Sequence, residues 1–198
     1  MEIIEPFNPL SKTNLGLSVA EALLQKAIVP LPPERFVGAG VYAIYYSGDF
    51  PAYEPISEKN SDGKWLQPIY VGKAIPEGAR RGGLGLDIPA GSVLSKRLNE
   101  HAKSIREVSG LEPRDFACRY LIVDDIWIPL GESLLIEMFR PLWNVVVDGF
   151  GNHDPGSGRY KQQRSPWDML HPGRLWAEKC QPGRSADDIL SQIALHYG

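Results

Sequence analysis

Two short apolar runs, residues 40–46 (GVYAIYY) and 68–73 (PIYVGK), dominate the first half of the chain. Both are rich in β-branched and aromatic residues and are bounded by Gly or Pro, a pattern that predicts β-strands. Each run carries a tyrosine within a Gly/Tyr tripeptide, so pairing of the two strands would bring Tyr42 and Tyr70 near each other on one face. The neighbouring glycines leave room for a ligand to approach closely. The alternative is a hairpin whose tyrosines are only cross-strand packing partners.

Further along the chain, apolar and polar positions alternate over residues 116–122, which predicts a third strand. Helices are expected over about 18–27, where Ser18 and Glu21 have the form of a capping box, over 92–106, over about 130–140, and from Ser185 onward. A further short strand is expected over 141–147.

Length and composition predict one domain, or one domain with appendages, and a sizeable core, since the chain has 198 residues of which 43% are hydrophobic. It contains no apolar run long enough for a transmembrane helix. The acidic start of the chain lacks the basic region of a signal peptide. Cys118 and Cys180 lie far apart and without metal-ligand spacing, which predicts two reduced thiols and a cytoplasmic protein.

The formal net charge of −3 does not by itself suggest nucleic acid, but the charge is unevenly distributed. Residues 71–106 hold seven basic and three acidic side chains, and residues 156–184 hold six basic and two acidic ones, so each stretch carries +4. Two basic stretches in an acidic protein could form a phosphate-binding surface. The alternative is that these side chains are simply a solvated face.

Several side chains suited to phosphate chemistry follow in order. Arg97 and His101 are four residues apart and share one face of the predicted helix 92–106. Glu132 is expected in the first turn of the next helix, where a carboxylate also interacts favourably with the helix dipole alone. The Gly-rich polar loop 149–159 contains Asn152 and His153, side chains of types that hydrogen-bond bases or phosphates.

The ordered set GVY, YVG followed by Lys73, Arg97 with His101, Glu132 and Asn144 resembles the GIY-YIG nuclease superfamily over residues 38–147. Valine replaces isoleucine in both name-giving tripeptides. The segments 31–36 (LPPERF), 141–153 and 171–174 (HPGR) are similar to one type II restriction endonuclease branch of that superfamily, which recognises CCGCGG.

The resemblance implies a single nuclease domain over 1–198 with an α+β fold, in which helices flank a central antiparallel three-stranded sheet. The catalytic module would span about 38–147, an N-terminal helix about 18–27, and a DNA-recognition and C-terminal extension about 148–198. It further implies a cytoplasmic prokaryotic enzyme that cuts double-stranded DNA with Mg²⁺. A homodimer would read the palindrome, and a cognate DNA methyltransferase is implied functionally.

The same resemblance implies residue roles. Tyr42 or Tyr70 would activate the attacking water, with Lys73 helping to lower the tyrosine pKa and His101 accepting its proton. Arg97 would contact the scissile phosphate, and Glu132 would be the single protein ligand of the metal. The candidate DNA contacts are Arg80, Arg81, Asn144, Asn152, His153, Arg159, Lys161 and Arg164.

Two other functions stay open. One is a structure- or damage-specific nuclease of the same superfamily without sequence preference, against which the long polar loop in the C-terminal part counts. The other is a non-catalytic DNA-binding module, against which the complete set of catalytic-type residues counts.

Overall fold

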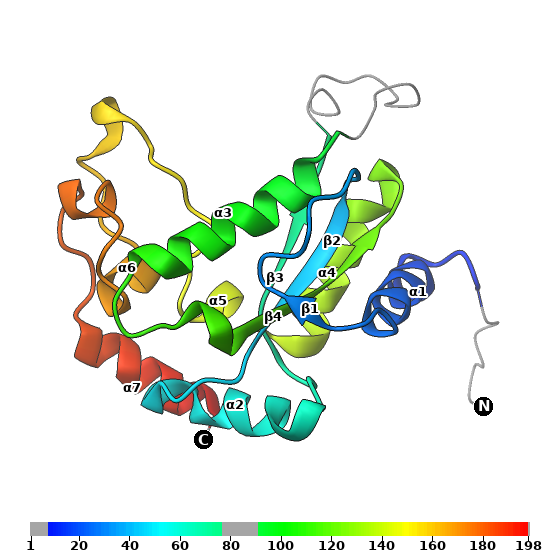
Figure 1. Cartoon of the computed structure of the whole chain (residues 1–198), viewed down its shortest axis with the longest axis horizontal. Coiled ribbons are helices and arrows are strands. Elements are labelled where there is room, and N and C mark those ends of the chain that lie inside the picture. The colour runs from blue at the N-terminus through cyan, green and yellow to red at the C-terminus, as the bar shows by residue number, and fades with distance from the viewer. Residues whose placement is uncertain (1–7, 77–90, 198) are drawn as a thin grey trace, which may run out of the picture.

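The computed structural model describes residues 8–76 and 91–197. It has one antiparallel sheet in the order β1-β4-β2-β3, with helices on both of its faces (Figure 1). The strands are β1 (Val29–Pro30), β2 (Gly40–Tyr46), β3 (Pro68–Ala74) and β4 (Phe116–Ile122). The helices are α1 (Lys12–Leu24), α2 (Glu54–Asn60), α3 (Val93–Glu107), α4 (Ile128–Phe139), α5 (Leu142–Val145), α6 (Pro166–Leu170) and α7 (Ala186–Tyr197).

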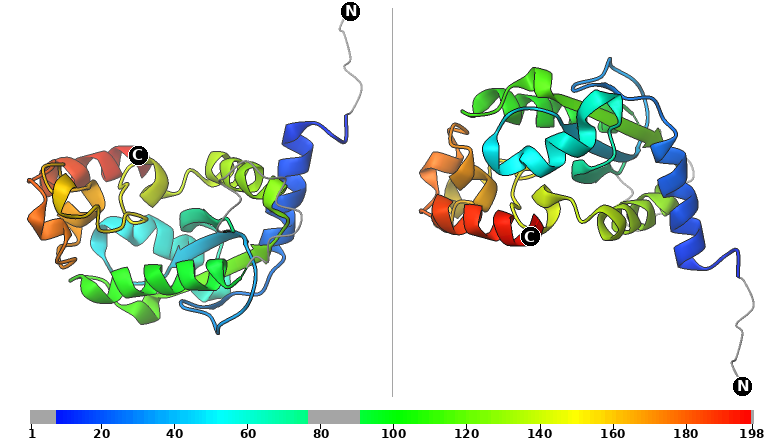
Figure 2. Two further views of the ribbon diagram at one scale, coloured as in Figure 1. Left: turned by 90° about the horizontal axis from the view of Figure 1, so that it is seen from above. Right: turned by 90° about the horizontal axis from the view of Figure 1, so that it is seen from below.

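Strand β2 is the centre of the molecule, because all seven of its residues are buried. Its alternate side chains enter two different cores. Val41 and Ala43 pack with residues of α1 and α4, whereas Tyr42 and Ile44 pack with residues of α3 and of the C-terminal segments. Figure 2 shows α3 and α4 on opposite sides of the sheet. The continuous apolar run of β2 is therefore the pattern of a strand covered on both faces.

The predicted α+β class is confirmed, but the sheet has four strands within the described residues rather than the three expected. The additional strand is β1, in which Val29 and Pro30 pair with Cys118 and Ala117 of β4. A two-residue strand ending in proline carries no alternation that a sequence pattern could reveal. β1 pairs with β4 because the segment that joins α1 to β2 runs alongside β4.

The N-terminal helix lies earlier than the predicted 18–27. The helix begins after Ser11 and ends at Leu24. The Ser11 hydroxyl oxygen accepts a hydrogen bond from the backbone N–H of Asn14 at 3.2 Å. Ser18 is thus inside the helix rather than its N-cap. Gly16 lies against α4, where an added Cβ would be 3.1 Å from the Leu134 side chain. Close packing on α4 extends the helix through a residue that disfavours helix by itself.

The predicted strand over 141–147 is wrong, because residues 142–145 of this segment form the short helix α5, which contains Asn144. The predicted helices 92–106 and 130–140 correspond to α3 and α4, and the helix expected after Ser185 is α7. Cys118 and Cys180 are both buried and unbridged, as expected. Among the helices of the described residues, none is long and apolar enough to cross a membrane.

Candidate active site

A cleft of about 590 Å³ opens beside the β2–β3 pair and the first turns of α3. Five of the six side chains predicted to be catalytic line it, and the sixth, His101, lies behind Tyr42. Those five come from β2, β3, α3 and α4, so the fold brings together residues that span ninety positions of sequence. The lining is Tyr42, Tyr70, Lys73, Ala74, Ile75, Pro76, Val93, Lys96, Arg97, Glu100, Glu132 and His153.

The two tyrosines share one face of the sheet because of the strand register. Tyr42 pairs with Gly72, and Ile44 pairs with Tyr70, so the tyrosine rings lie diagonally with their centroids 6.2 Å apart. A Cβ at Gly72 would be 2.4 Å from the Tyr42 hydroxyl oxygen. Glycine is thus required at the second tripeptide because the Tyr42 ring lies directly over it.

The Tyr42 hydroxyl oxygen lies 2.6 Å from Nε2 of His101, in a fully buried pair. Burial, with the nearby Tyr70 as a smaller cause, raises the Tyr42 pKa well above its ordinary value. Burial, reinforced by the positive charge of Arg97, lowers the His101 pKa well below its ordinary value. Both side chains are therefore neutral near pH 7, and Nε2 of a neutral imidazole can accept a hydrogen bond from the phenol.

Arg97 points from α3 into the cleft and is bound on its outer side. Its Nη2 donates to the Gly151 carbonyl at 2.8 Å, and its Nη1 donates to Glu100 at 3.2 Å and contacts His153 Nε2. Burial, with the charge of Arg97 as the second cause, lowers the His153 pKa below its ordinary value. The guanidinium is thus oriented by the loop after α5, and its planar fork suits a phosphate.

Glu132 forms an ion pair with Lys73, with 2.5 Å between Oε2 and Nζ. Because α4 begins at Ile128, Glu132 lies in its second turn rather than in the first turn that the sequence suggested. The helix dipole acts mainly on side chains in the first turn. It therefore explains a carboxylate in the second turn less well than one in the first turn, where the sequence placed Glu132. The Glu132 carboxylate instead faces the cleft, where its partner is the Lys73 ammonium group.

A metal site at this position would rest on one protein carboxylate. No group of three or more His, Cys, Asp or Glu side chains suited to a metal ion occurs in the described part of the chain. Mg²⁺ keeps most of its waters and is commonly held by one or two carboxylates together with substrate phosphates. Glu132 alone therefore fits Mg²⁺ with bound DNA, and it does not fit a metal that needs a closed set of nitrogen or sulfur ligands.

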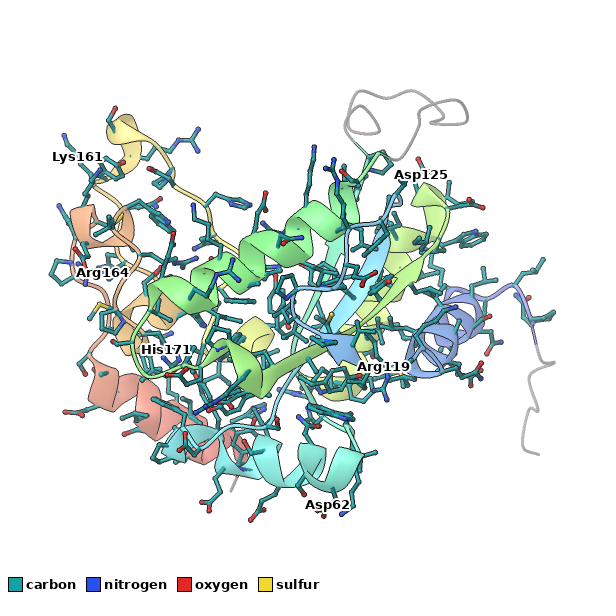
Figure 3. All side chains as sticks on the ribbon, viewed as in Figure 1. Asp62, Arg119, Asp125, Lys161, Arg164 and His171 are labelled. Atoms are coloured by element: carbon teal, nitrogen blue, oxygen red, sulfur yellow. The ribbon has the colours of Figure 1, made fainter. Side chains whose placement is uncertain are left out.

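The predicted DNA contacts fall into different environments. Asn152, His153, Arg159 and Lys161 are exposed, and Lys161 lies at the outer edge of the C-terminal segments (Figure 3). Arg164 instead donates to the carbonyls of Ala177 and Glu178 at 3.1 and 3.3 Å. Arg80 and Arg81 lie outside the described residues.

Asn144 is bound within the free protein. Its side-chain amide accepts from the Val71 N–H at 2.8 Å and donates to the Val71 carbonyl at 2.9 Å. The amide therefore ties α5 to β3 directly beside Tyr70. Contact of Asn144 with DNA stays a prediction.

Sequence reasoning missed three contributors to the site. Lys96 lines the cleft one residue before Arg97. The Phe150 ring stacks on His101 with centroids 4.5 Å apart. Arg174 binds the loop that orients Arg97. The HPGR segment marked Arg174 through the resemblance alone, because no local pattern shows which distant carbonyls a buried guanidinium will bind.

A comparison with known protein families supports a nuclease domain in this chain. The profile of the Eco29kI GIY-YIG domain matches residues 34–197, which covers the whole sheet except β1, the cleft and the C-terminal segments. No curated protein sequence matches the chain. A match of this extent covers far more than half of the sequence. The chain therefore belongs to the Eco29kI GIY-YIG domain family, a family of restriction-type nucleases.

Proposed function

We propose that this protein is a type II restriction endonuclease that hydrolyses double-stranded DNA at the palindrome CCGCGG. The observation that carries the proposal is the convergence of Tyr42, Tyr70, Lys73, Arg97 and Glu132 in one cleft, with His101 behind Tyr42. The family supports a restriction-type nuclease. The specific site is supported by the similarity of segments 31–36, 141–153 and 171–174 to the branch that reads CCGCGG.

The Tyr42–His101 pair supplies the base. A water molecule in the cleft gives a proton to the Tyr42 oxygen while the Tyr42 proton moves to Nε2 of His101. The resulting hydroxide bonds to phosphorus, and the bond from phosphorus to the leaving oxygen breaks. The leaving oxygen takes a proton from solvent water, and His101 returns its extra proton to solvent. Because the pKa of Tyr42 is raised and that of His101 is lowered, neither is ionised beforehand, and the transfer proceeds as the hydroxide forms. Tyr70 would then donate a hydrogen bond to the phosphate.

Arg97 would bind the scissile phosphate and stabilise the charge that develops on it. Glu132 would hold the divalent metal, Mg²⁺, which when bound supplies Lewis-acid stabilisation of the leaving oxygen. Lys73 lies next to the same carboxylate and adds positive charge near Tyr42 and the phosphate.

The exposed loop 152–161 would read bases and phosphates through Asn152, His153, Arg159 and Lys161. One such loop in each chain reads one half-site, so a homodimer would cover the palindrome. As a restriction enzyme, the protein would work in the cytoplasm of a prokaryote beside a methyltransferase that protects the same sequence.

A plasmid digestion tests the proposal. Two plasmids that differ only by one CCGCGG site are incubated with the protein and Mg²⁺, with the Glu132→Gln variant as control. We expect a single linear product from the plasmid with the site, and none from the other plasmid or with the variant.

Discrete fragments from the plasmid without the site would refute the CCGCGG specificity but retain the restriction activity. A smear from both plasmids would indicate a nuclease without sequence preference. No cleavage under any condition, with binding retained, would indicate a non-catalytic DNA-binding module. Sedimentation of the protein with a short duplex in Ca²⁺ tests the homodimer, which one chain per intact site would refute.

A further inference from the structure

Arg174 is almost completely buried, and all five of its N–H donors have partners. Nε and Nη2 bind the two Asp168 carboxylate oxygens at 2.6 and 2.7 Å. Nη2 also donates to the Gly149 carbonyl at 2.9 Å, and Nη1 donates to the carbonyls of Phe150 and Asn152 at 3.2 and 3.1 Å. A single guanidinium therefore holds three carbonyls of one four-residue segment.

The remaining carbonyl of that segment, that of Gly151, accepts from the Arg97 guanidinium at 2.8 Å. Four successive carbonyls, 149 to 152, are thus shared between a buried arginine and the arginine of the cleft. Residues 149–152 also lie next to two further residues of the site, Tyr70 and His101. A Cβ at Gly151 would be 2.8 Å from the Tyr70 hydroxyl oxygen, and the Phe150 ring stacks on His101.

The Arg174 guanidinium is further fixed by two aromatic rings. Its carbon lies 4.5 Å from the Trp167 ring and 4.7 Å from the Trp176 ring. Paired with a carboxylate and enclosed between rings, the guanidinium has little freedom to move. The Arg174 guanidinium binds the chain at both ends of the exposed loop 152–161. At the start of the loop it binds carbonyls of residues 149–152, and beyond the end of the loop it binds Asp168.

We propose that Arg174 is a positioning residue for catalysis, which holds Arg97 in place through the backbone of residues 149–152. This inference rests on the proposed nuclease function. It assigns the C-terminal segments a role in the chemistry as well as in DNA recognition. A change in the exposed loop on binding DNA would reach Arg97 through the same segment.

The test compares Arg174→Lys with Arg119→Lys. Lysine at 174 keeps a positive charge beside Asp168 but cannot bind three carbonyls at once. Arg119 is a matched control because it too binds backbone carbonyls, those of Lys26 and Trp65 at 2.9 and 3.0 Å, and stacks on a tyrosine. Arg119 lies toward α1, away from the C-terminal segments, whose position is marked in Figure 3 by the labels of His171 and Arg164.

We expect the single-turnover cleavage rate of Arg174→Lys to fall about 100-fold, since a small misplacement of a catalytic group has an effect of this size. The single-turnover cleavage rate and the DNA dissociation constant of Arg119→Lys, the latter measured in Ca²⁺, should both stay near wild type. In an Arg97→Lys background the Arg174→Lys effect should largely disappear. An undiminished effect in that background would show that Arg174 acts only on stability and would overturn the inference, as would a wild-type rate for Arg174→Lys.

A second measurement does not depend on cleavage. In protein labelled with ¹⁵N-arginine, the Arg97 Nε–H signal, assigned by its loss in Arg97→Lys, should move in Arg174→Lys and stay in Arg119→Lys. If wild type cuts no DNA, the proposed function fails, and this signal alone decides the inference, because an unmoved signal refutes it. If Arg174→Lys does not fold, Trp176→Leu, which removes one partly exposed ring from Arg174, should move the signal in the same way.

Discussion

A fall in pH should destabilise the protein through His171, which lies in the aromatic core and does not line the cleft. Its Nε2 is 2.6 Å from the Tyr53 hydroxyl oxygen, and its Nδ1 is buried with no hydrogen-bond partner among the described residues. Burial lowers the pKa of His171 from 6.5 to about 3. The folded protein therefore resists protonation of this ring, while the unfolded chain accepts the proton readily.

The size of the effect follows from the two pKa values. A base whose pKa is lower in the folded state stabilises the fold fully above the unfolded pKa, and this stability is lost progressively as the pH falls from 6.5 toward about 3. Each pH unit in that window corresponds to about 1.4 kcal/mol. At about pH 5, His171 should therefore lower the free energy of unfolding by about 2 kcal/mol relative to about pH 7.

Urea denaturation followed by tryptophan fluorescence, at about pH 7 and about pH 5, measures the effect in wild type and in His171→Gln. Glutamine does not titrate and keeps an acceptor for the Tyr53 hydroxyl. Protonation of His101 and of carboxylates contributes equally to both proteins, so the difference between their pH responses isolates His171. Wild type should lose about 2 kcal/mol more than the variant. Equal losses would refute the burial argument for His171.

Three other substitutions address the cleft directly. Tyr42→Phe should lower the single-turnover cleavage rate at least about 100-fold without weakening DNA binding, because only the hydroxyl is lost; a near-normal rate would move the role of base to Tyr70. Glu132→Gln should cut several orders of magnitude more slowly at saturating Mg²⁺, yet bind DNA in Ca²⁺ as tightly or more tightly. A role limited to the helix dipole would instead cost at most about 1 kcal/mol of stability and leave cleavage nearly intact. Gly72→Ala should lose cleavage with a folded circular dichroism spectrum, because the methyl group displaces the Tyr42 hydroxyl; a wild-type rate would contradict the close approach at this position.

The parts of the fold that local pattern determines could be predicted from the sequence. Strands β2, β3 and β4 carry continuous or alternating apolar residues, and α3 carries an apolar stripe, so each was expected close to its observed bounds. Where tertiary contacts decide, prediction failed. β1 exists because it pairs with β4, and α1 extends through Gly16 because of its packing on α4.

The candidate site divides in the same way. Its side chains could be selected from residue types in a recognisable order, and the fold brings Tyr42, Arg97 and Glu132 to one cleft. The groups that orient those side chains could not be selected. Arg174 acts on Arg97 through carbonyls 149 to 152, and neither its spacing nor its neighbours in sequence indicate which backbone groups a buried guanidinium binds.

The Asn144 amide has a consequence for how copies of this chain can meet. Strand β3 is at the edge of the sheet, and an edge strand offers free N–H and C=O groups to which another strand can add. Asn144 binds both backbone groups of Val71, as one residue of a neighbouring strand would. A second chain that extended the sheet here would first have to displace that amide and separate α5 from β3. The edge nearest Tyr70 is thus closed to pairing with a strand of another chain.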